Sequence, residues 1–198
     1  HGSNGTPSSA NTYEGTIHVN GGTATFRNAG INNNTADLAI DSVITGTGTI
    51  VLDGNDAARS IAFNTANPFS GTVEMIDLGT FEIGNELALQ NATLDMLATP
   101  VADLDFRSLT AITLGALTGA NGILLENAAS APVNLSVGNN DTDTTYSGSL
   151  SGSGALTKIG DGTLTLAGDN SYSGVTTISG GVLKLDHANA LGTQVGAG

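Results

Sequence analysis

The sequence predicts an all-β protein built as a β-solenoid, and three observations support this fold class. Apolar and polar residues alternate in short bursts along the chain, which places one face of each burst in a core and the other in solvent. Gly, Asn, Asp and Ser separate the bursts about every ten residues, a pattern typical of short strands joined by turns. Two short sequence elements also recur, as expected when similar coils stack on one another.

Composition supports a folded core and excludes several classes of protein. Hydrophobic residues make up 39% of the 198 residues, whereas aromatic residues make up only 4%. Because there is no cysteine, disulfides, thiolate metal sites and cysteine nucleophiles are excluded. The 18 acidic and 5 basic residues give a net charge of −13, which argues against binding to nucleic acid or to anionic membranes. No apolar run is long enough for a membrane-spanning helix.

The expected strands follow from the period-two alternation. In chain order they are residues 49–52, 71–75, 80–83, 92–96, 111–114, 132–137, 162–166 and 181–185. The best candidate for a helix is the segment 85–97. Gly84 precedes this segment and alternation resumes at Ala92, so no helix is expected there and the whole chain is expected to be all-β.

The recurring elements favour a solenoid over a sandwich or an antiparallel barrel. The first element places two apolar residues six positions apart around small residues, at 44–50, 117–123 and 150–156. The second pairs an aromatic residue with a glycine two positions later, at Tyr13/Gly15, Phe69/Gly71, Tyr146/Gly148 and Tyr172/Gly174. Three of these aromatics follow an asparagine by two residues, namely Asn11, Asn67 and Asn170.

The spacing of these elements predicts the size of one coil. The distance from the first element to the second is 25, 29 and 22 residues, which suits a coil of about three strands. Seven or eight coils stacked at about 4.8 Å would give a length of about 35–40 Å. The irregular spacing between residues 76 and 117 leaves a sandwich open as the alternative.

One segment resembles a known repeat. Residues 156–185 read LTKIGDGTLTLAGDNSYSGVTTISGGVLKL, and this stretch is similar to the passenger-associated transport repeat of bacterial autotransporters. The resemblance begins at Gly154, and Ala188 to Gly192 resemble what commonly follows such a repeat. Asn67 to Ile83, and more faintly Asn11 to Phe26, are degenerate versions of the same pattern.

The resemblance implies a right-handed parallel β-helix that is exported through the inner membrane. It also implies that a C-terminal outer-membrane barrel, beyond these 198 residues, carries the passenger to the cell surface. We interpret residues 1–3 as a remnant of cloning and residues 4–198 as a fragment of a β-helical passenger, with the clearest repeat at 154–185.

The function expected from this resemblance is an elongated scaffold for adhesion and self-association, without catalysis and without a cofactor. Its expected partners are a protein or glycan on a host or neighbouring cell, or a second copy of itself, but not nucleic acid. Two alternatives are a carbohydrate-active β-helix enzyme and an inert stalk that presents another domain.

Isolated histidines and serines offer no catalytic motif. His1 falls in the presumed cloning remnant, His18 points outward from the alternating segment 16–19, and His187 follows a strand. None has a second histidine at the spacing of a metal site. The segment 168–171 approaches a serine-protease motif, but we interpret it as a turn inside the repeat. No catalytic, cofactor-binding or metal-binding residue is therefore assigned.

Paired carboxylates need separate attention because β-helices often cleave polysaccharides with such pairs. The pairs are Asp103/Asp105, Glu82/Glu86, Glu74/Asp77 and Asp141/Asp143. Asp103 and Asp105 would share one face of a strand. The simpler interpretation is a solvated face opposite the core residues Leu104 and Phe106.

The segment 139–143 offers oxygen ligands for calcium, and whether Asp141 and Asp143 bind it is left open because the spacing of known calcium loops is absent. The repeated aromatics at positions 13, 69, 146 and 172 are expected to fill the corners of the solenoid rather than to bind a sugar.

Overall fold

The computed structural model describes residues 11–13, 15–28, 38–97 and 103–193 and confirms the all-β prediction. The presumed cloning remnant at 1–3 lies outside the described residues. The strands are β1 (Asn11–Tyr13), β2 (Thr16–Arg27), β3 (Leu38–Ile40), β4 (Val43–Phe63), β5 (Thr72–Ile83), β6 (Leu89–Met96), β7 (Asp103–Asp105), β8 (Ala111–Gly119), β9 (Ile123–Leu124), β10 (Asn134–Val137), β11 (Thr144–Tyr146), β12 (Leu150–Ser151), β13 (Leu156–Lys158), β14 (Thr163–Leu166), β15 (Thr176–Ile178) and β16 (Val182–Leu185). Within this part of the chain there is no helix, and hence none that could cross a membrane.

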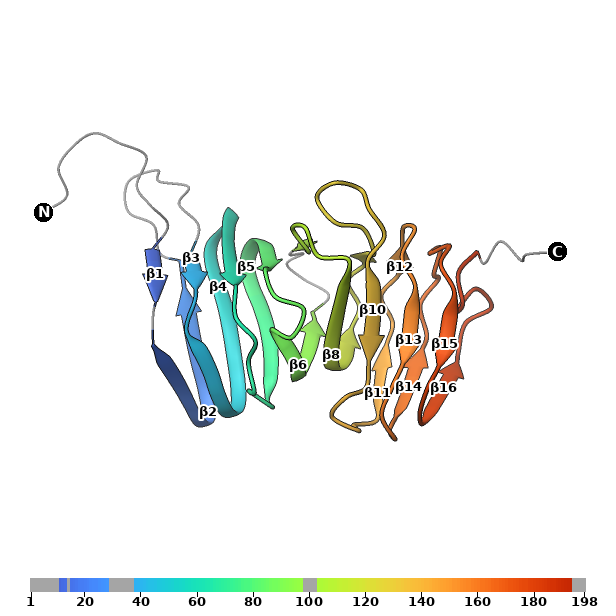
Figure 1. Ribbon diagram of the computed structural model, residues 1–198, viewed down its shortest axis with the longest axis horizontal. Coiled ribbons are helices and arrows are strands. Elements are labelled where there is room, and N and C mark those ends of the chain that lie inside the picture. Colours follow the sequence, from blue (N-terminus) through green and yellow to red (C-terminus); the bar gives the residue numbers. More distant parts are fainter. Residues whose placement is uncertain (1–10, 14, 29–37, 98–102, 194–198) are drawn as a thin grey trace, which may run out of the picture.

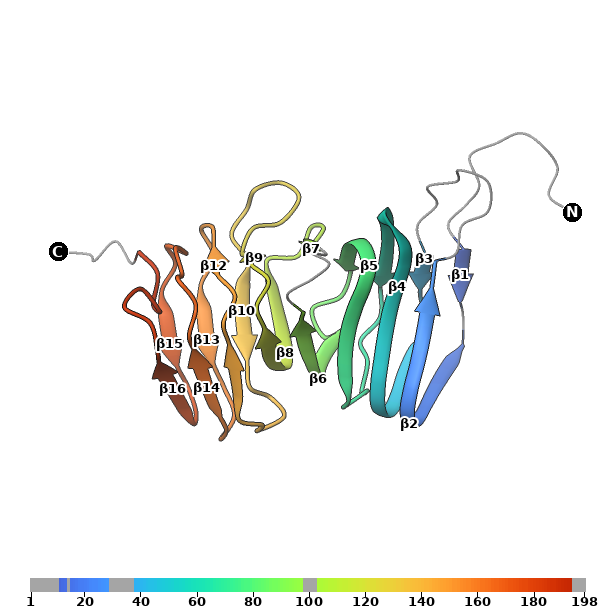
Figure 2. The same ribbon diagram turned by 180° about the vertical axis from the view of Figure 1, so that it is seen from behind.

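The strands stack in parallel as a solenoid of about seven turns (Figure 1). Its first side consists of β2, the beginnings of β4 and β5, β6, the end of β8, β11, β14 and β16. The ends of β4 and β5 form a second side with β1, β3 and β7. The start of β8 forms a third side with β10, β13 and β15. Fourteen strands join into one sheet because β4, β5 and β8 continue around a corner. The short strands β9 and β12 pair separately and are seen from behind in Figure 2.

The core is made of apolar ladders that run along the solenoid axis. On the first side, Ala24, Ile50, Val73, Leu94 and Leu117 are in register on successive strands. The last four of these residues are completely buried. This stacking of inward-facing side chains explains the period-two pattern of the sequence, because each strand buries alternate residues against the coils above and below it.

All expected strands are confirmed, and parallel pairing through residues 72–119 replaces the sandwich alternative. The irregular spacing there has a structural reason. β8 passes from the third side to the first without a turn, because Gly115 and Ala116 are small. A Cβ atom on Gly115 would lie 2.4 Å from the carbonyl carbon of Asn91. The following coil packs against this corner, where the backbone N–H of Asn140 donates to Gly115 O at 3.2 Å.

Coil length varies more than the repeated elements suggest. Gly119 is the register partner of Tyr146, which pairs in turn with Leu166, and Leu166 pairs with Leu185. The stretch of sequence from Gly119 to Tyr146 is therefore clearly longer than the stretch from Tyr146 to Leu166 or from Leu166 to Leu185. The longer coil contains two excursions, at 126–132 and 138–143. The C-terminal coils, which match the transport repeat, have tighter turns and hence shorter coils.

Two of the asparagines ahead of an aromatic residue have the same hydrogen-bonding role at two different corners. Asn67 lies between the second side and the first, and Asn170 lies between the first side and the third. The Asn67 amide accepts a hydrogen bond from Ile44 N–H and donates one to Ala88 O. The Asn170 amide makes the same two bonds, to Leu150 N–H and Ala190 O. Each asparagine therefore joins the coil before it to the coil after it.

The aromatic residues two positions after these asparagines, Phe69 and Tyr172, are at most 2% exposed. Tyr146 of β11, which has no asparagine two positions before it, is fully buried as well; the side chain of Tyr13 lies outside the described residues. The glycine that follows leaves space for the ring, since a Cβ on Gly71 would lie 2.5 Å from Phe69.

Candidate functional site

The first side of the solenoid presents columns of short polar side chains to solvent. One column contains Thr23, Thr49, Thr72 and Thr93 in register. A second contains Thr25, Val51, Glu74, Asp95 and Thr118, and its continuation toward the C-terminus contains Thr145, Thr165 and Lys184. Threonine is suited to this position because its branched side chain favours strands while its hydroxyl tolerates solvent.

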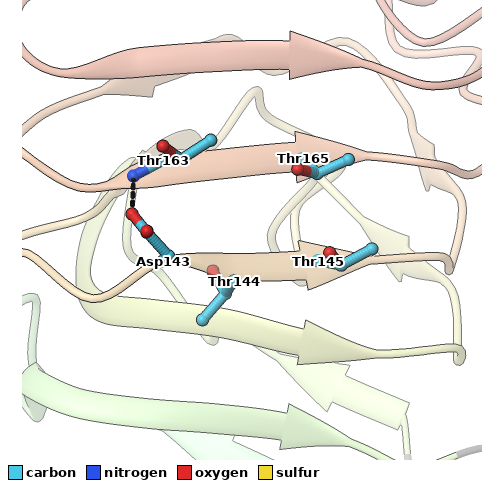
Figure 3. Close-up of a pocket in the computed structure, with 5 residues that line it drawn as sticks. All are labelled: Asp143, Thr144, Thr145, Thr163 and Thr165. Carbon is cyan, nitrogen blue, oxygen red and sulfur yellow. Dashed lines mark hydrogen bonds between the residues drawn. The ribbon is translucent and has the colours of Figure 1, made fainter.

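A groove of about 280 Å³ opens on this side near the C-terminal end, lined by Asp143, Thr144, Thr145, Thr163 and Thr165 (Figure 3). β11 and the residue before it supply three of these residues, and β14 supplies two. The Asp143 carboxylate accepts a hydrogen bond from Thr163 N–H at 2.6 Å, which fixes one of its oxygens. Thr165 is only 8% exposed although it lies on the outward column.

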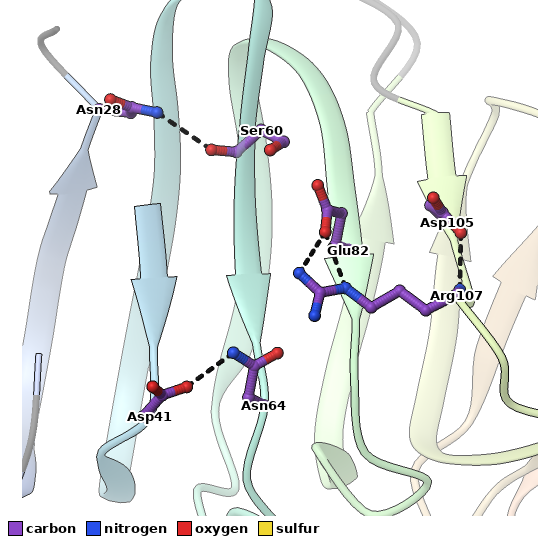
Figure 4. Close-up of polar contacts among 7 residues, drawn as sticks. All are labelled: Asn28, Asp41, Ser60, Asn64, Glu82, Asp105 and Arg107. Carbon is purple, nitrogen blue, oxygen red and sulfur yellow. Dashed lines mark hydrogen bonds and ion pairs between the residues drawn. The ribbon is translucent and has the colours of Figure 1, made fainter. Parts of the chain in front are cut away.

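Of the carboxylates at 82, 103 and 105, Glu82 and Asp105 lie beside Arg107 on the second side (Figure 4). Arg107 donates through Nε to Glu82 Oε2 at 2.7 Å and forms an ion pair with it. Asp105 accepts the backbone N–H of Arg107 at 2.6 Å, which supports the left-handed conformation of that residue at φ 51°. Asp103 is exposed. Glu82 therefore joins two coils through Arg107, and Asp105 stabilises the turn at Arg107. Nearby contacts, such as Asn28 to Ser60 O and Asn64 to Asp41, also join coils.

The remaining paired carboxylates separate in the structure. Asp77 has a left-handed backbone conformation within β5, at φ 44°, and Glu86 is exposed in the turn before β6. Glu74 lies in register with Asp95 of the next coil instead. Desolvation by partial burial raises the pKa of Asp95 above 3.8. The sequence alone could not predict that Glu74 and Asp95 are neighbours, because the length of the coil between them determines which residues of adjacent strands are in register.

The raised pKa of Asp95 leads to a pH-dependent prediction. The folded state holds the Asp95 proton more tightly than the unfolded state, so ionisation of this carboxyl at neutral pH reduces stability. Asp95→Asn is expected to raise the melting temperature slightly at pH 7, and this gain should shrink as the pH falls toward 3.8. Thermal unfolding followed by circular dichroism at several pH values measures it. Asp103→Asn, the same change at an exposed carboxylate, is the control; an equal gain there would attribute the effect to net charge alone.

The candidate calcium segment forms a folded loop that binds two other coils. Asp141 accepts the backbone N–H of Asp161 at 2.7 Å, as Asp143 does for Thr163. Asn139 donates to Gln90 O at 2.9 Å, 49 positions back along the chain. Across the ranges that the structure describes, no three His, Cys, Asp or Glu residues are grouped so that they could hold a metal ion.

The histidine and serine candidates occupy ordinary turn and surface positions. His18 Nδ1 lies 2.8 Å from Thr45 Oγ1 on an exposed surface, and His187 Nδ1 accepts the Asn189 N–H at 3.2 Å. His1 lies outside the described residues. At the segment 168–171, Asp169 accepts a hydrogen bond from the Asn189 amide at 2.8 Å, which is consistent with the turn predicted there.

A projecting loop at 126–132 was not anticipated from the sequence (Figures 1 and 2). The Asn127 side-chain oxygen Oδ1 accepts the N–H groups of Ala129 and Ala131, each at 3.0 Å. Its amide nitrogen donates to Leu109 O at 3.0 Å, so the loop has a fixed shape. The signal in the sequence is an asparagine ahead of small residues and a proline, which favours a turn.

The fold and the polar contacts together define a repeat-built β-solenoid whose carboxylates and asparagines mainly join neighbouring coils. The passenger-associated-transport-repeat family model matches residues 8–23 and 156–185. Over 142 residues the chain is 36% identical to the adhesin BmaC autotransporter of Brucella suis biovar 1 (strain 1330). The chain is therefore a segment of an autotransporter passenger domain.

The aligned region is a large part of this chain but a small part of the Brucella protein. The alignment with the Brucella protein covers 70% of this chain but only 4% of that protein. No solved structure gives a significant match. The second family match begins and ends at the residues expected from the sequence, 156 and 185. As part of an autotransporter passenger, the chain lies at the cell surface or outside the cell, after export through the outer membrane.

Proposed function

We propose that this chain is part of an elongated scaffold for adhesion and self-association and that it has no catalytic activity of its own. The partners in this proposal are a protein or glycan on a host or neighbouring cell, or a second copy of the chain. The observation that carries the proposal is the 36% identity over 142 residues to a protein named as an adhesin. The stacked coils are compatible with this role because they provide a long, regular outer surface.

A bead assay tests the adhesion part of the proposal. Fluorescent beads coated with the 198-residue segment are expected to bind epithelial cells several-fold more than beads coated with albumin at the same density. The number of beads per cell is counted by microscopy. Binding no greater than that of albumin, together with monomeric sedimentation at every salt concentration, would favour the inert stalk instead.

The net charge of −13 makes self-association dependent on salt. Like-charged chains repel each other at low ionic strength, and screening over about 10 Å at 0.1 M salt weakens that repulsion. Sedimentation velocity is expected to show more associated material as NaCl increases. A sedimentation profile that stays the same from low to high salt would contradict self-association.

The carbohydrate-active enzyme remains a separate candidate with its own test. Incubation with acidic and neutral polysaccharides would release products if the chain were such an enzyme. Loss of that release in Asp103→Ala or Asp105→Ala would overturn the proposal. The contact of Asp105 with Arg107 N–H supports a structural role for this carboxylate.

A further inference from the structure

We propose that Asn20 is a site of spontaneous deamidation and that the fold protects Asn121 from the same reaction. Both asparagines are followed by glycine, which favours the reaction because glycine has no side chain to obstruct its backbone nitrogen. A further Asn-Gly step, at residues 4–5, lies outside the described residues. The modification needs no partner, so it is independent of the proposed adhesion role.

The reaction is a ring closure followed by hydrolysis. The backbone nitrogen of Gly21 loses its proton and attacks Cγ of Asn20. The bond from Cγ to the side-chain nitrogen breaks, and ammonia leaves carrying that proton. Water then opens the succinimide ring at either of its two carbonyl carbons and leaves aspartate or isoaspartate. The net change consumes one water, releases one ammonia and converts an amide to a carboxyl group.

Asn20 precedes an irregular point in β2. The register between β2 and β4 shifts directly after this residue. Gly21 and Gly22 there oppose the single residue Gly48, which makes a β-bulge. Both glycines of β2 have left-handed backbones, at φ 69° and 70°. Because a bulge interrupts the regular ladder of hydrogen bonds, the attacking nitrogen can turn toward the side-chain amide more easily here than inside a regular strand.

The surroundings of Asn20 are open. Residues 20–23 are all exposed. Among the described residues, no heavy atom beyond those of adjacent positions would lie within 4 Å of a Cβ atom on Gly21 or Gly22. The Asn20 side chain can therefore reach the reacting position without displacing a neighbour, and water can reach the ring that forms.

Asn121 has the same glycine neighbour but is held by adjacent coils. The residue is only 8% exposed, and its backbone N–H donates to Met96 O at 3.1 Å. Its carbonyl oxygen accepts a hydrogen bond from the Tyr146 hydroxyl. That carbonyl belongs to the same peptide group as the attacking nitrogen of Gly122, so the hydrogen bond restrains the group that must rotate. Reaction at Asn121 therefore requires a local opening of the solenoid.

Deamidation at Asn20 changes both the charge and the backbone of the N-terminal coils. The new carboxylate adds to a chain that already carries −13. Isoaspartate also lengthens the main chain at a close contact between coils, where a Cβ atom on Gly48 would lie 2.5 Å from Gly22 O. The modification therefore disturbs the stacking of β2 on β4.

Incubation of the folded protein at mildly alkaline pH, followed by peptide mass spectrometry, tests the site. Cleavage after arginine and glutamate gives the peptides 15–27 and 108–126, which contain Asn20 and Asn121 as their only asparagines. The mass increase that accompanies exchange of an amide for a carboxyl is followed in each peptide over time. Asn20 is expected to convert at least about tenfold faster than Asn121. Equal rates, or no conversion at Asn20, would overturn the proposal.

The same incubation in denaturing urea is the control for the role of the fold. Urea removes the hydrogen bonds that hold Asn121, so the two rates are expected to become similar. A ratio in urea as large as that in the folded protein would attribute the difference to neighbouring side chains and would overturn the protection inferred for Asn121. Asn20→Gln lengthens the side chain, so the five-membered ring cannot form, and peptide 15–27 should keep its starting mass. A mass increase in that peptide of the variant would contradict the ring closure.

Discussion

Asn170→Ala is expected to lower the free energy of unfolding by about 2–5 kcal/mol, because two buried backbone groups lose their partners at once. The Asn170 amide accepts Leu150 N–H at 2.7 Å and donates to Ala190 O at 2.6 Å, and the residue is only 2% exposed. Alanine can make neither bond, and the closed corner restricts access of water. Urea unfolding followed by circular dichroism measures the loss.

The neighbouring serine provides the control for this prediction. Ser171 is exposed, and its backbone N–H, not its side chain, bonds to Leu150 O at 2.8 Å. Ser171→Ala should therefore change stability by less than about 0.5 kcal/mol. If Asn170→Ala unfolds at the same urea concentration as Ser171→Ala, the asparagine does not join the coils as inferred. Asn67→Ala tests the equivalent bridge near the other end.

The recurrence of asparagine ahead of an aromatic residue predicted a repeated structural element, and Asn67 and Asn170 show that this element is a bridge between coils that occurs at two different corners. Each side-chain amide accepts a hydrogen bond from the coil before it and donates one to the coil after it, so that three successive coils are joined. This signal is local in sequence, since the residues that fill the corner are only two positions apart. The sequence could therefore reveal both the corner and the transport repeat.

The groove at Asp143 could not be predicted in the same way. Its two strands are brought together by the register that pairs Thr145 with Thr165, and the coil before them, from Gly119 to Tyr146, is longer. Period-two alternation predicts which side of a strand faces solvent, but it does not determine which residues become neighbours on adjacent coils. The pairing of Glu74 with Asp95 escaped prediction for the same reason.

The second large effect is expected at the opposite end of the solenoid, where the core contains an aromatic ladder. Phe81 is fully buried, and its ring meets Phe63 edge to face with the centroids 5.1 Å apart. Phe81→Ala should lower the free energy of unfolding by about 3–5 kcal/mol, since it removes this contact and leaves a cavity. Phe81→Leu keeps most of the apolar volume and should cost only about 1 kcal/mol. Equal stability of the two variants would show that the site collapses around the smaller side chain.

The location of the damage in Phe81→Ala is as informative as its size. In a solenoid each coil contacts only its neighbours, so stability is a sum of local terms and nearest-neighbour terms. Hydrogen exchange is therefore expected to show reduced protection in residues 38–97 of Phe81→Ala and retained protection in residues 150–190, with the reverse in Asn170→Ala. Loss of protection along the whole chain in either variant would mean that the coils unfold as a single cooperative unit. A difference between the ends would instead mean that the C-terminal coils, with their shorter turns and asparagine bridge, can stay folded while the aromatic coils open.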